Sequence, residues 1–133
     1  MIKLEMAKRG VAAAEKKAEE LGIKITTCVV DEKGLIVIMA RMDDALPISP
    51  RFAESKAYTA CVLRMPTKSL LDYAAPDEPY YGVTSLFAGE FTTIPGGLPV
   101  QIEERFVGGV GVGGGAPDQD EQCAKAALQA ITI

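Results

Sequence analysis

The stretch Gly108–Gln122, GGVGVGGGAPDQDEQ, decides how the C-terminal part of this chain folds. Gly109, Gly111 and Gly114 match the letters G-x-G-x-x-G of a dinucleotide-binding loop. That fingerprint needs a second parallel strand that carries an acidic residue about 20 residues further on. Residues 115–133 are all that follow, and most of them show a helical pattern. The Walker loop is excluded as well, because no Lys-Ser or Lys-Thr follows the glycines.

A β-strand fits the same letters better. Gly109, Gly111 and Gly113 would lie on one face of the strand, and Val110 and Val112 on the other. A strand face without side chains lets another element approach the backbone closely. An Ala-rich helix of this chain is the favoured neighbour, and a flat ligand is the alternative.

The end of the stretch, Gly114-Gly115-Ala116, leads into a helix that begins at Pro117. Free N–H groups and the helix dipole at such a start can bind an anion such as a carboxylate. Asp118 and Asp120 already satisfy the dipole and would repel a second negative charge unless a cation offsets it. We interpret them as ordinary helix-start residues, with an anion site as the alternative.

The rest of the chain shows clear helix and strand patterns. Apolar residues at helical spacing predict a helix over about 4–21 that ends at Gly22. β-Branched residues predict strands over 23–30 and 35–42, joined by a turn at Asp31–Gly34. The other predicted elements are a helix with Ser49 as N-cap and Pro50 at its first position, a short helix over 66–73, a loop over 75–82, a short helix or strand over 83–88, strands over 91–94, 100–103 and 105–112, a turn at Glu103-Glu104, and a helix over 117–130.

This order of elements predicts one domain over residues 1–133 with an α+β fold. The expected core is a mostly antiparallel sheet of about five strands with helices on its faces. The run 35–40, LIVIMA, does not alternate between apolar and polar residues. Such a run predicts a strand that is covered on both faces, by helices or by another subunit.

Composition excludes several classes of function. The net charge is −4, and no Lys or Arg occurs from Ser69 to Glu104, which argues against nucleic acid as a partner. No apolar run approaches the roughly 20 residues that span a bilayer, and the N-terminus shows no signal-peptide pattern, so we expect a cytoplasmic protein. Cys28, Cys61 and Cys123 form no CxxC pair and are expected to be buried rather than to bind a metal. The chain has no histidine, which excludes Ser-His-Asp and Cys-His catalysis.

Six motifs occur in one order along nearly the whole chain: VVDEKG (29–34), ARMDDA (40–45), ESKAYTA (54–60), PYYG (79–82), PGGLPV (95–100) and GVGVGGGAPDQDE (109–121). With these motifs the chain resembles the GlcG/HbpS-like family, also called the haem-degrading or PduO C-terminal family. The resemblance implies a profilin-like fold with a five-stranded antiparallel sheet and a homo-oligomer. It also implies binding of haem or another tetrapyrrole.

The resemblance extends to individual residues. The positions that match the family motifs are Asp31, Gly34, Arg41, Asp43, Lys56, Tyr81, Gly82, Gly96, Gly97, Gly114, Gly115, Pro117, Gln119 and Asp120. Gly113 and Ala116 depart from the family pattern, which often has Ser and Thr there. A haem site that uses histidine cannot exist in this chain, and the remaining axial candidates are Met39, Met42, Met65, Tyr80, Tyr81, Lys56 and the cysteines.

These observations support three hypotheses about function. The first is a small-ligand-binding protein, with haem or a tetrapyrrole as the implied ligand. The second is a small catabolic enzyme that does acid/base chemistry on a carboxylate or hydroxy acid; Lys56 and Arg41 would hold the anion, and Asp43 or Glu54 would move a proton. The third is an oligomeric accessory or scaffold protein. The proposed ligand-binding residues are Arg41, Lys56, Tyr81, Gly96, Gly97, Gly114 and Gly115.

Overall fold

The structure is a computed structural model that describes residues 1–133. Its helices and strands, in chain order, are α1 (Leu4–Leu21), β1 (Thr26–Asp31), β2 (Ile36–Arg41), α2 (Ser49–Leu63), α3 (Thr67–Ala74), the 3-10 turns η1 (Val83–Ser85) and η2 (Phe87–Gly89), β3 (Gly97–Ile102), β4 (Arg105–Gly113) and α4 (Pro117–Ile131). No helix combines the length and hydrophobicity that a bilayer crossing requires.

The N-terminal helix and hairpin form as their sequence patterns predict. α1 ends at Gly22, whose φ of 72° is a left-handed conformation that favours glycine. In the hairpin turn, Asp31 Oδ1 accepts hydrogen bonds from the backbone N–H groups of Lys33 and Leu35. Gly34 completes the turn with φ 81°. The predicted turn at Glu103-Glu104 is confirmed too, with both residues at positive φ.

The sheet has four strands, in the order β2-β1-β4-β3, and every neighbouring pair is antiparallel. The prediction of about five strands is wrong because residues 91–94 form no strand. Side-chain hydroxyl groups bond this segment instead of a neighbouring strand. The Thr92 N–H donates to Thr59 Oγ1, and the Thr67 hydroxyl donates to the Ile94 carbonyl oxygen.

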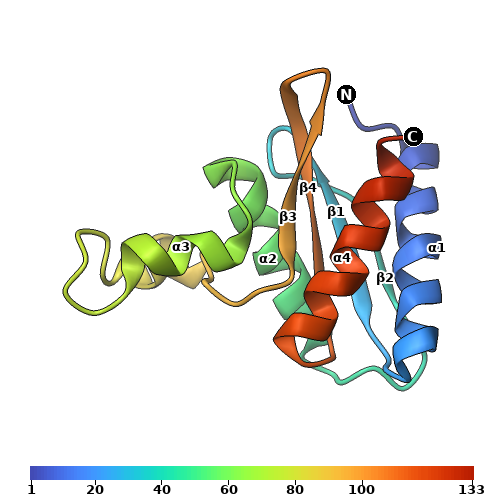
Figure 1. Ribbon diagram of the computed structural model, residues 1–133, viewed down its shortest axis with the longest axis horizontal. Helices are drawn as coiled ribbons and strands as arrows, with labels where there is room; N and C mark the ends of the chain where they lie inside the picture. The colour runs from blue at the N-terminus through green and yellow to red at the C-terminus, as the bar shows by residue number, and fades with distance from the viewer.

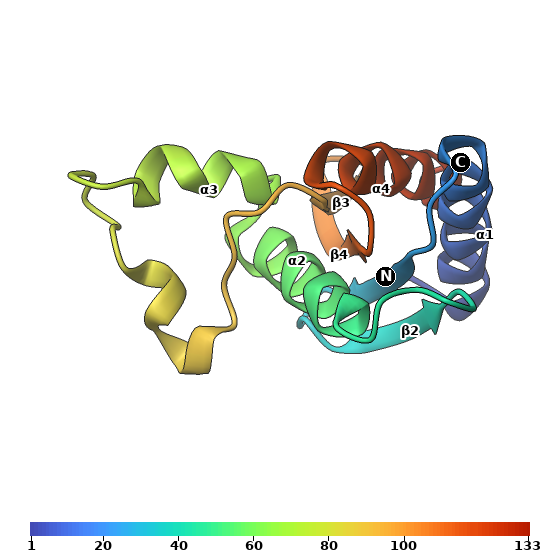
Figure 2. The same ribbon diagram turned by 90° about the horizontal axis from the view of Figure 1, so that it is seen from below.

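Helices cover both faces of the sheet (Figure 1). α1 and α4 lie side by side on one face, and α2 lies on the other, as Figure 2 shows from below. Val110 and Val112 of β4 point into the larger core, under α1 and α4, and are fully buried. A smaller core of five buried residues joins β1 to α2: Cys28, Val30, Ala53, Ala57 and Cys61.

The glycine face of β4 is covered by α2 and not by a ligand. A Cβ atom added to Gly109 would lie 2.5 Å from the carbonyl oxygen of Ala57. One added to Gly111 would overlap the carbonyl oxygen of Ala53, and one added to Gly113 would lie 2.7 Å from Phe52 Cβ. The helix backbone therefore rests directly on the strand, which only glycine allows.

One local prediction needs correction, and another is met only in part within a single chain. Ser49 is not the N-cap of α2, since Ile48 holds that position and Ser49 is the first helical residue. Ser49 is fully buried, and its hydroxyl group lies 2.7 Å from that of Thr26 in β1, so it joins the helix to the sheet. β2 is an edge strand, and within one chain it is only partly covered; Ile36 is 48% exposed.

Residues 67–90, which we call the arm, project from the body of the fold (Figures 1 and 2). The arm contains α3, which confirms the predicted short helix, and the segment 83–88 forms 3-10 turns. Neither η1 nor η2 buries a residue. The arm carries six exposed large hydrophobic side chains: Leu71, Tyr73, Tyr80, Tyr81, Leu86 and Phe87.

Replacing Gly111 by Ala tests the contact between α2 and β4. We expect Gly111→Ala to lower the free energy of unfolding by about 3 kcal/mol, because the added methyl group meets helix backbone that cannot move without lifting α2. Urea denaturation measures this loss. In the control Gly22→Ala nothing lies within 4 Å of the added Cβ, and the left-handed conformation alone costs about 1 kcal/mol. Equal losses in the two variants would contradict the contact.

Candidate functional site

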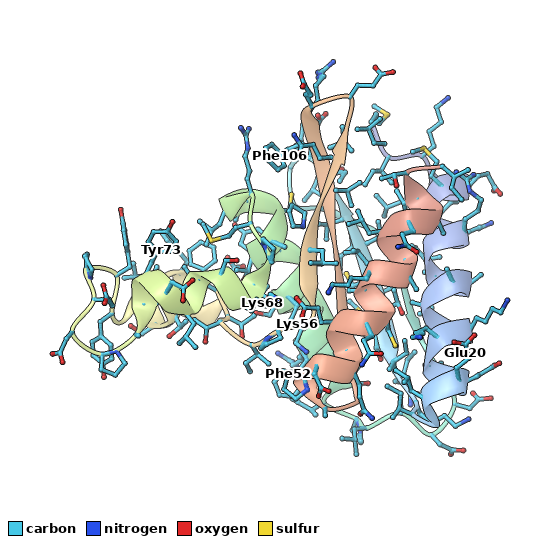
Figure 3. All side chains as sticks on the ribbon, in the orientation of Figure 1. Glu20, Phe52, Lys56, Lys68, Tyr73 and Phe106 are labelled. Carbon is cyan, nitrogen blue, oxygen red and sulfur yellow. The ribbon has the colours of Figure 1, made fainter.

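Lys56 lies in the middle of α2 and points between the sheet and α4 (Figure 3). Its side chain is only 2% exposed. Glycines of β3 and β4 let α2 approach the sheet at this residue, since a Cβ at Gly97 would overlap the Lys56 carbonyl oxygen and one at Gly111 would lie 3.0 Å from Lys56 Cβ. This turn of α2 therefore lies directly against the two strands.

The Lys56 ammonium group has two hydrogen-bond partners and lies 5.8 Å from the ring centroid of Phe52. Nζ donates to the Val112 carbonyl oxygen at 2.8 Å and to Asp120 Oδ2 at 2.9 Å. Asp120 is 3% exposed in its side chain, so both charges of this ion pair are buried. The other carboxylate oxygen, Oδ1, accepts the Gly115 N–H at 2.8 Å. The pair connects α2, the end of β4 and the first turn of α4.

This geometry corrects the interpretation of Asp120 as an ordinary helix-start residue. Its carboxylate turns back from α4 to Gly115 and Lys56, and Lys56 is the cation that offsets its charge. Asp118 is exposed and forms no ion pair, as a helix-start residue would. Gln119 accepts the Ala116 N–H at 3.0 Å, which completes the bonding of the turn before α4.

Burial shifts the pKa values of both partners toward their neutral forms. Burial lowers the pKa of Lys56, and the charge and hydrogen bond of Asp120 oppose that shift. Burial likewise raises the pKa of Asp120, against the opposing effect of Lys56 and of the Gly115 N–H. The environment therefore brings the proton affinities of amine and carboxylate closer together than they are in water.

A pocket of about 240 Å³ lies over this pair. Lys56 and Asp120 are its only charged lining residues. Its other walls are Leu46, Ile48, Phe52, Ile94, Gly114, Gly115 and Pro117. Leu46, Ile48 and Phe52 are also partly exposed to solvent, which places them toward its mouth. The pocket is apolar except for one amine and one carboxylate.

Gly96 keeps the space next to the amine clear. Its φ is 128°, a conformation that favours glycine, and a Cβ there would lie 2.8 Å from Lys56 Nζ. Gly96 also accepts the Val112 N–H through its carbonyl oxygen at 2.9 Å. The turn before β3 is thereby held against the end of β4, beside the ion pair.

The structure brings together some of the predicted site residues and not others. Lys56, Gly114 and Gly115 line the pocket, and Gly96 and Gly97 lie against Lys56. Arg41, Asp43, Glu54 and Tyr81 are exposed, do not line the pocket and form no ion pair with one another. The prediction omitted Asp120 and the apolar wall. Asp120 belongs to the same motif, GVGVGGGAPDQDE, as Gly114 and Gly115, and that is the signal that could have found it.

A double-mutant cycle measures the coupling of the buried pair. We expect Lys56→Met to lower the free energy of unfolding by about 3–5 kcal/mol, because it leaves the Asp120 carboxylate buried without its partner. The double variant Lys56→Met/Asp120→Leu should recover most of that loss, since no buried charge remains. Urea denaturation of the single and double variants gives both values.

The matched control is Lys68→Met. Lys68 is 53% exposed and pairs with Glu121 at 3.3 Å, so its removal should cost less than about 1 kcal/mol. If Lys56→Met were as mild as the control, the Lys56–Asp120 pair would not be a buried charge pair in solution.

Comparison with known proteins identifies relatives of this chain. A family model described as "Haem degrading protein HbpS-like" matches residues 2–129. An uncharacterized 15.0 kDa protein in the dhaT-dhaS intergenic region of Citrobacter freundii is 37% identical over 131 residues, or 98% of this chain and 92% of that protein. The corrinoid adenosyltransferase PduO of the same organism is 35% identical over 91% of this chain, which spans only 36% of the length of PduO.

Solved structures show the same fold. The Klebsiella pneumoniae protein ORFY superposes with a TM-score of 0.95 at 35% identity, covering 98% of this chain and 90% of ORFY. A PduOC:heme complex superposes with a TM-score of 0.93 at 30% identity, covering 96% of this chain and 93% of PduOC. The motif order, the fold and the family match agree, and the chain belongs to the HbpS-like family.

Proposed function

We propose that this chain is a small-ligand-binding protein and that its ligand occupies the pocket over Lys56 and Asp120. The observation that supports this is a buried amine and carboxylate at the base of an otherwise apolar pocket. Pockets for drug-sized ligands measure roughly 300–1,000 Å³. A pocket of about 240 Å³ suits a smaller molecule with a short apolar part.

The charges of the site favour a ligand with a neutral oxygen group. Asp120 cancels the charge of Lys56, so the pair has little net attraction for an anion, and a bound carboxylate would lie near that of Asp120. A lysine ammonium has three N–H donors, and two of them have acceptors here. A hydroxyl or carbonyl oxygen can accept the third. Arg41, Asp43 and Glu54 lie outside the pocket, so any acid/base chemistry in it falls to Lys56 and Asp120.

Titration with matched small molecules tests the pocket. Butanamide should shift the backbone amide resonances of Gly114 and Gly115 at about tenfold lower concentration than butyrate, because the carboxylate of butyrate loses its hydration beside Asp120. Two-dimensional ¹H–¹⁵N NMR of labelled protein gives both binding curves. The variant Lys56→Met/Asp120→Leu is the control and should lose the shifts. No shift with either compound would remove the proposal.

A second candidate function is haem binding, which the likeness to the PduOC:heme complex favours. The pocket over Lys56 does not fit a haem held by an axial ligand: its volume is small, and Lys56 is engaged by Asp120. The thiols are unsuited as ligands, since burial raises the pKa of Cys28 to about 12 and that of Cys123 to about 11. The thioether of Met42 is also engaged within the fold, because its Sδ accepts a hydrogen bond from the Ile25 N–H.

The arm offers better-exposed candidates. Tyr80 and Tyr81 are 60% and 67% exposed, and a tyrosine phenolate can hold haem iron. Leu86 and Phe87 on the same arm would supply apolar contact. We therefore place any haem on the arm and not in the pocket over Lys56.

Hemin titration tests this second candidate. We expect the wild-type protein to shift the Soret band of hemin and the double variant Tyr80→Phe/Tyr81→Phe to lose the shift, because the phenolate ligands are gone. Tyr73→Phe, on the same arm, is the control and should behave like the wild type. An absent shift, or one that persists in the double variant, would rule out haem bound by these tyrosines.

We also propose that the chain assembles as a homo-oligomer, which would suit an accessory or scaffold role. The support is the arm, which carries six large hydrophobic side chains that are exposed within one chain. A second copy lying on the arm would remove this surface from water. The profilin-like class and the cytoplasmic location remain predictions.

A further inference from the structure

We propose that Lys56 is a nucleophile that forms a reversible imine with a short aliphatic aldehyde or ketone bound in the pocket. This inference rests on the proposed function, because it names a substrate class for the same pocket. Three features of the structure carry it: the position of the amine, the apolar walls around it, and the carboxyl group beside it.

The amine lies at the wall of the pocket although its side chain is almost wholly buried. Lys56 lines the pocket together with Asp120, and its Nζ lies 5.8 Å from the ring centroid of Phe52, another residue of the pocket wall. Gly96, which would bring a Cβ within 2.8 Å of Nζ if replaced, leaves the amine unblocked on that side.

The apolar walls favour the reactive form of the amine. Only the neutral amine attacks a carbonyl carbon, and desolvation in an apolar pocket is one way in which proteins make lysine nucleophilic. Burial lowers the pKa of Lys56, and each unit of that fall raises the neutral fraction at neutral pH about tenfold. Phe52, Ile94 and Pro117 contribute to these apolar walls.

Asp120 is placed to supply the proton that the reaction consumes. The ion pair first becomes neutral when Lys56 Nζ passes one proton to Asp120 Oδ2. The neutral nitrogen then attacks the carbonyl carbon, a C–N bond forms, and a proton passes from nitrogen to the former carbonyl oxygen. The resulting hydroxyl group then leaves as water with the proton of Asp120, whose Oδ2 lies 2.9 Å from Nζ. Neutral amine, carboxylic acid and carbonyl compound thus give a protonated imine, a carboxylate and one water.

The product keeps the electrostatics of the site balanced. The protonated imine carries one positive charge at the position of Nζ, next to the carboxylate of Asp120. This ion pair replaces the original one, and the Gly115 N–H still donates to Asp120 Oδ1. Imine formation therefore leaves no buried charge without a partner, so the fold tolerates it.

Reductive trapping of the intact protein tests the proposal. The protein is incubated at neutral pH with propanal and cyanoborohydride, digested, and analysed by mass spectrometry for propylated lysines. We expect Lys56 to be propylated at least about tenfold faster than the exposed Lys68, because the pocket holds propanal beside the amine and Asp120 supplies the proton that the reaction consumes. In urea the two rates should become equal. The variant Asp120→Asn should slow the reaction at Lys56 at least about tenfold, as expected when a general acid is lost.

The comparison between lysines uses wild-type protein, so it stands even if Asp120→Asn fails to fold. If Lys56 reacts no faster than Lys68 while butanamide still shifts the Gly114 and Gly115 resonances, the imine is overturned and the ligand-binding proposal survives. If propanal does not label Lys56 preferentially and butanamide causes no shift, both proposals fall.

Discussion

The direct contact between the α2 backbone and the glycine face of β4 is the constraint on which the rest of this structure depends. Gly109, Gly111 and Gly113 leave no side chain between helix and strand, and Ala53 and Ala57 of α2 fill the shallow space that remains. The core on the other face of the sheet is built from larger side chains under α1 and α4. The sheet therefore contacts helix backbone directly on the α2 face, whereas a layer of larger side chains separates it from α1 and α4 on the other face.

This close contact is also what allows a lysine to become buried. With α2 resting on β4, the Lys56 side chain can extend past the end of β4 to Asp120. Burying one charge costs several kcal/mol, and a partner at hydrogen-bond distance offsets much of that cost. Three segments that are distant in sequence thus meet at one amine. The same arrangement that stabilises the pair leaves it at the base of an apolar pocket, where amine and carboxyl chemistry are both available.

Elements with strong local signals could be predicted from the sequence, and elements that depend on distant hydroxyl groups could not. The helix α1, the hairpin turn at Asp31 and the C-terminal helix follow from periodicity, from an aspartate and glycine turn, and from a proline start. Residues 91–94 read as a strand by composition. Their backbone groups bond to Thr59 and Thr67 instead, and no local pattern reveals partners so far away in the chain.

The sequence by itself indicated that the glycine-rich stretch is a strand, since glycine and valine alternate over residues 109–113. It also pointed to Lys56, Gly114 and Gly115, and its motifs indicated the family. Only the tertiary structure decided that α2 covers the glycine face, that Asp120 is the partner of Lys56, and that Arg41, Asp43 and Glu54 lie elsewhere. The physical reason is that burial and charge pairing depend on which surfaces meet in space, whereas periodicity and turn chemistry act over a few neighbouring residues.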